Sequence, residues 1–162
     1  MRSTAAHSTV SIDDINSSDI FFQKDTNTRI AKVWSEILFD KNCYWINSAH
    51  SGYKDIFGII HNRKIHIDSE KLIIRGQDYF SKPTKHLVNI PKKMFIRFHI
   101  HPEIKLNVTT SKKKVFLQLK NNIAWEFICS EAKIKLKEGI YLGSKKTIQK
   151  NNHILISENL VP

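Results

Sequence analysis

The eight histidines are the side chains in this sequence that are most able to do chemistry. Two of them, His99 and His101, are separated by one residue within an alternating apolar and polar stretch. On a β-strand, residues i and i+2 lie on one face about 6 to 7 Å apart, a spacing that suits two ligands of one metal ion. A catalytic metal needs a third ligand, and the nearby acidic residue, Glu103, lies beyond Pro102. We therefore interpret the pair as polar residues on a half-buried sheet face.

Other catalytic motifs are missing from the sequence. There is no Gly-x-Ser-x-Gly elbow for a serine nucleophile. The five glycines are scattered, so they do not form a phosphate-binding loop, and they are typical of turns and bulges. No pair of carboxylates has a spacing that indicates glycoside hydrolysis. From these side chains alone, the sequence predicts no complete active site.

Cysteine use gives little evidence of chemistry. Cys43 and Cys129 are the two cysteines, and no Cys-x-x-Cys spacing of a zinc site occurs. Both lie in apolar, strand-like stretches. We interpret them as buried small hydrophobic residues, with a single disulfide as the alternative.

The elements that position these residues are predicted to be β-strands. Alternation with period two recurs along the chain, and no window of a dozen residues shows a helical stripe. Short polar turns between the runs indicate antiparallel neighbours, and the number of runs favours a sandwich over a small barrel. We expect an all-β, antiparallel, two-layer β-sandwich of about ten or more strands. The expected strands cover residues 9–12, 29–39, 44–48, 57–67, 72–76, 94–101, 115–120, 123–127, 134–136, 140–142 and 153–156.

The charge of the chain suggests a polyanionic partner. The formal net charge is +11, and lysine runs such as Lys112-Lys113-Lys114 stand at expected turns. Lysine is also a common solubilising residue at turns and sheet edges. No aromatic residues interleave these runs as stacking platforms, so we do not expect nucleic acid as a partner. No apolar run approaches the roughly 20 residues of a membrane-spanning helix, so we expect no membrane partner.

Short blocks along the chain carry a family resemblance. They are RSTAAHSTV at 2–10, NSS at 16–18, HSGY at 50–53, HNRK at 61–64, RGQD at 75–78, FHIHP at 98–102 and YLG at 141–143. In this order and spacing they resemble the carboxy-terminal part of heparinase II/III-like proteins. The resemblance covers nearly the whole chain, and agreement over several blocks is more specific than any single block.

The resemblance implies an amino-terminal α/α toroid, a carboxy-terminal β-sandwich, and cleavage of uronic-acid polysaccharides by β-elimination. It implies that residues 1–162 are an incomplete sandwich domain without the toroid, and that the chain begins after the first strands of the sheet domain. We therefore expect Thr4 to Ile12 to present unpaired backbone groups or apolar surface, and the isolated chain to associate. The family suggests a periplasmic location, although the sequence shows no signal peptide.

The resemblance also implies site residues. His7 matches a histidine that completes a structural zinc site in metal-binding members; its partner ligands lie upstream in those proteins, so we expect no cofactor in this chain alone. His50 and Tyr53 either line a substrate groove or pin a loop, and Ser51 replaces the family's usual aspartate there. No catalytic residue carries over.

Two functions follow from these expectations. The first is a lyase fragment that is inactive alone or acts with a separately encoded toroid chain. The second is a non-catalytic binding module for an acidic carbohydrate or a protein partner, which uses a basic sheet face and exposed aromatic residues such as Trp34, Trp45 or Tyr53.

Overall fold

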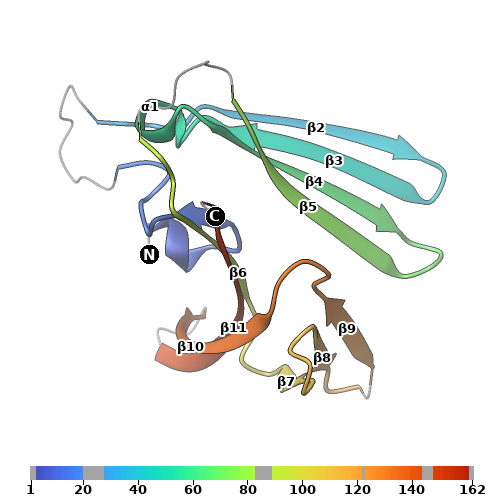
Figure 1. Cartoon of the computed structure of the whole chain (residues 1–162). Helices are drawn as coiled ribbons and strands as arrows, with labels where there is room; N and C mark the ends of the chain where they lie inside the picture. The colour runs from blue at the N-terminus through green and yellow to red at the C-terminus, as the bar shows by residue number, and fades with distance from the viewer. Residues whose placement is uncertain (1–2, 20–27, 83–88, 122, 144–147, 161–162) are drawn as a thin grey trace. The chain divides into compact units, whose positions relative to one another are not determined.

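The computed structural model describes residues 3–19, 28–82, 89–121, 123–143 and 148–160 (Figure 1). Pro83 and Asn122, which stand between expected strands, lie outside these residues. The elements are η1 (Thr4–Ala6), β1 (Val10–Ile12), β2 (Val33–Asp40), β3 (Cys43–His50), α1 (Lys54–Phe57), β4 (Ile60–Asp68), β5 (Ile73–Ser81), β6 (Lys93–His99), β7 (Lys105–Val108), β8 (Lys114–Gln118), β9 (Ala124–Ile128), β10 (Ile134–Leu142) and β11 (Ile148–Asn159).

The expected all-β, antiparallel fold is confirmed. The strands form three sheets, with the orders β1-β6-β11-β10, β2-β3-β4-β5 and β7-β8-β9. The helical segments η1 and α1 have three and four residues, so no helix in the described ranges is long enough to cross a membrane. The chain divides into two compact units, one of residues 16–91 and one of residues 1–15 with 92–162.

The unit of residues 16–91 contains a meander of four strands. Strands β2 and β3 are joined at Asp40 and Cys43, and Lys41 in this turn has a positive φ of 51°. Strand β4 pairs with β3 from His61 to Asp68, and with β5 from Ile60 to Asp68. Because the pairing is continuous, residues directly opposite one another form straight rows across the sheet.

The other unit contains the remaining two sheets. Val115, Ile134 and Ile154 form a buried cluster, and Phe98 and Phe127 pack against it. The ring centroids of these two phenylalanines are 5.1 Å apart. The apolar side chains of β8, β10 and β11 therefore meet in one core.

The amino-terminal strand differs from the sequence expectation in its burial. Val10 and Ile12 are fully buried and Ser11 is nearly so, so these residues of β1 do not present apolar surface. The strand does lie at the edge of its sheet, beside β6. The large exposed apolar side chains are found instead on other strands, such as Ile37 and Phe39 of β2.

Both cysteines are free and partly buried. Cys43 begins β3, whereas Cys129 packs against the core of the other unit. The interpretation as small hydrophobic residues fits their partial burial.

Candidate functional site

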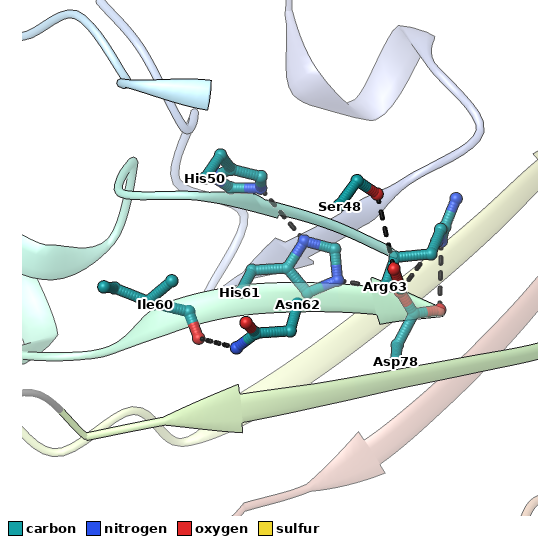
Figure 2. A network of polar contacts seen from close by, with 7 residues as sticks. All are labelled: Ser48, His50, Ile60, His61, Asn62, Arg63 and Asp78. Carbon is teal, nitrogen blue, oxygen red and sulfur yellow. Dashed lines mark hydrogen bonds and ion pairs between the residues drawn. The ribbon is translucent and has the colours of Figure 1, made fainter. Parts of the chain in front are cut away.

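Four polar side chains gather on one face of strands β3, β4 and β5. His50 lies directly opposite His61, and Arg63 lies directly opposite Asp78. His61 and Arg63 are two residues apart on β4, so they project from the same face of the strand. We call these four residues the histidine–aspartate network (Figure 2).

Hydrogen bonds join the network into one chain. The backbone N–H of Gly52 points at His50 Nδ1, 3.2 Å away. His50 Nε2 lies 3.0 Å from His61 Nδ1, and His61 Nε2 lies 2.7 Å from Asp78 Oδ1. Arg63 then donates to both carboxylate oxygens of Asp78, over 2.7 and 3.0 Å. Asp78 is thus held between an imidazole and a guanidinium in a fork geometry.

The geometry assigns the tautomers of both rings. Because Gly52 N–H is a donor, His50 Nδ1 must be the acceptor, and the proton of a neutral His50 therefore sits on Nε2. That proton is donated to His61 Nδ1, so His61 carries its own proton on Nε2 and donates it to Asp78. All the hydrogen bonds run in one direction, from Gly52 to the carboxylate.

Burial and charge set the ionisation of the network. Burial opposes the charged form of Asp78, but the hydrogen bonds from His61 and Arg63 and the guanidinium charge outweigh it, so its pKa lies below the ordinary value. Burial lowers the pKa of His50 to about 4, and nearby His61 and Arg63 act in the same direction. His50 is therefore neutral at pH 7, in agreement with its tautomer.

The network suits positioning better than proton abstraction. Every ring nitrogen of His50 and His61 is used in a hydrogen bond, and the side chains of His61 and Asp78 are only 4% and 8% exposed. A general base needs a lone pair within reach of a substrate proton. Among the described residues, no group of three or more potential ligands is placed to hold a metal ion. The network therefore ties three strands and the loop after β3 together.

That loop is fixed from its other side by Arg29. The guanidinium donates to the carbonyl oxygens of Ser17, Asn16 and Gly52 and pairs with Asp19 at 3.0 Å. Gly52 packs so closely on this segment that a Cβ there would lie 2.4 Å from the Ser17 carbonyl oxygen. A glycine is required at this point, and the sequence blocks at 16–18 and 50–53 are neighbours in space for this reason.

Tyr53, expected with His50 to line a groove or pin the loop, is fully buried. Its ring centroid lies 5.6 Å from that of His50 and 6.3 Å from that of Phe57. Tyr53 is therefore not an exposed aromatic residue, contrary to the expectation for a binding surface. This placement favours loop pinning, and substrate contact by His50 and Tyr53 stays a prediction.

His7 follows η1 as an exposed residue. Thr4–Ala6, directly before it, form a turn of 3-10 helix. The assignment of His7 as a zinc ligand stays a prediction.

His99 and His101 are not brought together on one strand face. Strand β6 ends at His99, whose Nε2 lies 3.0 Å from the Ala5 carbonyl oxygen. His101 is exposed beyond the strand end, where its Nδ1 accepts the Glu103 backbone N–H. The nearest histidine ring to His99 that the structure records is His153 of β11, with ring centroids 5.0 Å apart. The interpretation as polar residues on a half-buried sheet face holds for His99, whereas His101 is exposed and lies beyond the strand.

Sequence reasoning gave no role to His61, Arg63 and Asp78, although all three stand in the blocks that carry the resemblance. The available signal was the period-two spacing of His61 and Arg63 inside a strand-like run. That signal indicates a shared face, but it does not say which later residue is their partner. The pairing of β4 with β5 supplies Asp78.

Comparison with known proteins identifies the class. The family described as "Heparinase II/III-like, C-terminal" matches residues 1–160. The chain therefore belongs to the heparinase II/III-like C-terminal family.

Solved structures show the same fold. The heparan sulfate lyase HepC from Pedobacter heparinus matches 98% of this chain with a TM-score of 0.70 and 12% sequence identity. A structure described as "Heparinase III-BT4657 gene product" matches 98% with a TM-score of 0.69 and 14% identity. The chain spans 22% of the length of each of these proteins.

A curated relative has a different description. FtsZ-localized protein C of Caulobacter vibrioides (strain NA1000 / CB15N) is 26% identical over 105 residues, which cover 59% of this chain and 17% of that protein. The matched region is thus a small part of the relative as well.

Proposed function

We propose that this chain is the β-sheet portion of a heparinase II/III-like polysaccharide lyase, and that it is inactive alone or acts with an α/α toroid carried on a separate chain. The observation that carries the proposal is the difference between how much of the family match and how much of the whole lyase this chain covers. The family match takes in residues 1–160, whereas the chain spans only 22% of the lyase HepC.

The chemistry of β-elimination supports the proposal. Elimination next to a uronate carboxylate needs a base for the C5 proton, an acid for the leaving oxygen and a group that neutralises the carboxylate. The histidine–aspartate network does not supply these groups, because its nitrogens are committed to one another and to Asp78. The network instead holds strands β3, β4 and β5 together beside the loop at 51–53.

Turnover assays test whether the isolated chain lacks lyase activity. The purified protein is incubated with heparan sulfate, hyaluronan, chondroitin sulfate and alginate, and the ultraviolet absorbance of the unsaturated uronate product is followed. HepC on heparan sulfate is the positive control. We expect no product at any concentration at which this chain remains folded. Clear turnover would contradict the proposal.

The partner is tested separately. A tagged form of the chain, expressed at native level in its own host, is expected to co-purify with a protein of the α/α-toroid class that mass spectrometry identifies. Recovery of the chain without such a protein would argue against a split lyase, while leaving the family assignment intact.

A binding module for acidic carbohydrate or a protein partner is the second candidate function. It is favoured by two exposed tryptophans, Trp34 and Trp45, which are 50% and 49% exposed on the sheet of residues 16–91. The net charge of +11 favours an anionic ligand.

A further inference from the structure

Strand β2 forms one edge of the four-stranded sheet in the unit of residues 16–91 (Figure 1). Among the described residues, β3 pairs with its inner side and no strand pairs with its outer side. All eight residues of β2 are exposed, and Ile37, Leu38 and Phe39 are 63%, 53% and 62% exposed. A strand edge of this kind is a template for pairing with another strand.

The usual protections of an edge strand are missing from β2. Its sequence, VWSEILFD, contains no lysine, arginine, proline or glycine. Its pairing with β3 runs without interruption from Val33 to Asp40, so no bulge turns the edge away. The other edge strand of the sheet, β5, carries Arg75 and Gly76 near its centre, which make it a poorer template. The open edge of this sheet is therefore β2.

The backbone groups of β2 alternate between the two sides of the strand. The Ser51 N–H donates to the Lys32 carbonyl over 2.9 Å, and the Lys32 N–H donates to Ser51 Oγ. Lys32 therefore directs its backbone groups toward the β3 side. Because hydrogen-bonded positions alternate along an antiparallel strand, the even-numbered residues of β2 bond to β3 and the odd-numbered residues direct their N–H and C=O groups outward. The outward set is Val33, Ser35, Ile37 and Phe39.

Pairing of β2 with a second copy of itself would satisfy these outward groups. Opposite residues of an antiparallel pair share a face, so a two-fold axis passes through a residue, and odd-numbered positions meet odd-numbered positions. The outward N–H and C=O groups of one copy then bond to those of the other. Such a contact also closes on itself, because it uses the β2 edge of both copies.

Length and charge select the register of this pairing. An axis through Ile37 sets residues 34–40 of one copy opposite residues 40–34 of the other, with Ile37 against its own symmetry mate. An axis through Glu36 keeps the same length but places two carboxylates directly opposite each other, which is destabilising. An axis through Leu38 shortens the pairing and sets Glu36 against Asp40. The register centred on Ile37 combines full length with no like charges directly opposite.

We propose that this chain forms a two-fold dimer by antiparallel pairing of β2 with β2 of a second copy, centred on Ile37. The four strands of each copy then form one continuous sheet. Ile37 packs against its symmetry mate and lies diagonal to Phe39 of the second copy, so exposed apolar side chains are buried as the backbone bonds form. The contact uses no residue of the histidine–aspartate network. It is small beside the roughly 1,200 to 2,000 Å² of stable complexes, so the dimer dissociates on dilution.

Sedimentation velocity on the intact chain tests the proposal. We expect monomer at low protein concentration and dimer at high concentration, with no larger species. Ile37→Lys should weaken dimerisation at least about tenfold, because it sets two ammonium groups opposite each other across the axis. Ile74→Lys is the matched control, since Ile74 is 58% exposed on the same face of the sheet but on β5. This control should dimerise as the original chain does.

A proline substitution isolates the backbone contribution. The Ile37 N–H points outward, so Ile37→Pro removes hydrogen bonds across the axis and keeps the pairing of β2 with β3. We expect this variant to be monomeric and to retain cooperative urea unfolding. If it does not fold, the lysine variant and disulfide trapping still decide the proposal.

Disulfide trapping tests the register. In a background of Cys43→Ser and Cys129→Ser, Ile37→Cys should form a disulfide-linked dimer on mild oxidation, because Cα atoms of a directly opposite, hydrogen-bonded pair lie about 5.5 Å apart. Ser35→Cys is the matched control on the same edge. Its symmetry mate lies roughly 13 Å away along the strand, so it should not crosslink alone. A mixture of Ser35→Cys and Phe39→Cys proteins should crosslink, since these positions are opposite each other.

Three results would overturn the proposal. The first is a monomer at all concentrations, which would leave the β2 edge to a different partner. The second is an equal loss of dimer in Ile37→Lys and Ile74→Lys, which would place the contact on the face of the sheet. The third is crosslinking of Ser35→Cys alone, or no crosslinking of Ile37→Cys in a dimeric sample, which would reject the register. None of these measurements involves polysaccharide, so failure of the dimer and failure of the lyase proposal are distinguishable.

Discussion

Each compact unit contains a pair of histidines directly opposite one another on antiparallel strands, and the two pairs behave differently. His50 and His61 are joined by a hydrogen bond of 3.0 Å within the histidine–aspartate network. His99 and His153 have ring centroids 5.0 Å apart and an interplanar angle of 38°, without a recorded hydrogen bond between them. The same residue types at the same cross-strand position thus form a hydrogen-bonded pair in one unit and a ring contact in the other.

The surrounding groups account for the difference. His61 has Asp78 as an acceptor and His50 has Gly52 N–H as a donor, so each ring has a partner on both sides. In the second pair, His153 Nδ1 is buried without a partner among the described residues, as is Asn151 Oδ1 two residues away. An unpaired buried polar atom costs about 1 to 3 kcal/mol, so the first pair stabilises its unit and the second does not.

Gly139 marks the crowded side of the second pair. A Cβ on Gly139 would lie 2.8 Å from Asn151 Oδ1 and 3.4 Å from His153 Nδ1. Both atoms therefore point toward the backbone of β10, which presents no hydrogen-bond donor to them. The comparison shows that a cross-strand histidine pair has no fixed role; its neighbours decide it.

The largest effect is expected from removing the carboxylate of the first pair. Asp78→Ala leaves Arg63 and His61 without their acceptor in a buried position, and loss of one partner of a buried ion pair typically costs about 3 to 5 kcal/mol. Urea denaturation measures the change. Glu103→Ala, which removes an exposed pair with Lys120, is the control and should leave the midpoint unchanged. Equal midpoints for Asp78→Ala and the original chain would contradict the assigned role.

The two pairs are compared directly by the same substitution. His61→Phe leaves the His50 Nε2 proton without an acceptor and removes a donor from Asp78, so it should cost about 2 to 3 kcal/mol. His153→Phe keeps a ring beside His99 and removes an unpaired nitrogen, so the change should stay within about 0.5 kcal/mol. Both are measured by thermal and urea unfolding. Similar losses in the two variants would remove the distinction between the pairs.

A smaller effect is expected from pH. Folded His50 stays neutral down to its pKa of about 4, whereas an unfolded histidine takes up a proton below about pH 6.5. The unfolded state then binds more protons between these values, so stability falls as pH drops through this window. We expect a loss of about 2 kcal/mol from His50, allowing for its partial exposure. Burial also lowers the pKa of His153, which acts in the same direction.

His50→Gln isolates this contribution. Its amide can still donate to His61 but does not titrate, so the slope of unfolding free energy against pH between 4 and 6.5 should decrease. Urea midpoints at several pH values give the slope for both proteins. A variant with the same slope as the original chain would show that His50 is not the titrating group.

Several parts of the fold were predictable because their causes are local. The alternation in 44–48 and 94–101 predicted β3 and β6, although β3 extends to His50 and β6 stops at His99. Runs at 134–136 and 140–142 were expected as separate strands but form the single strand β10, because Gly139 continues the pairing with Asn151. Strand β7 was not predicted, since its four residues, Lys105–Val108, give too short a pattern.

The candidate site was predictable only in part. His50 and Tyr53 were singled out, and they do lie together near the loop at 51–53. Their partners are distant in sequence, because Asp78 is 17 residues from His61 and Ser17 approaches Gly52 from an earlier segment. No local pattern encodes such a meeting.

The residues alone specify an all-β, antiparallel protein, because period-two alternation and short polar turns act between neighbours in the chain. They also specify the basic charge and the family. The tertiary structure decides which polar residues meet. The register of β4 with β5 places Asp78 beside His61 and Arg63, and the registers across β2 to β5 align Trp34 with Tyr79 on the other face. A shift of one residue in any of these pairings would turn each strand's side chains to the opposite face, so the histidine–aspartate network exists only in the folded sheet.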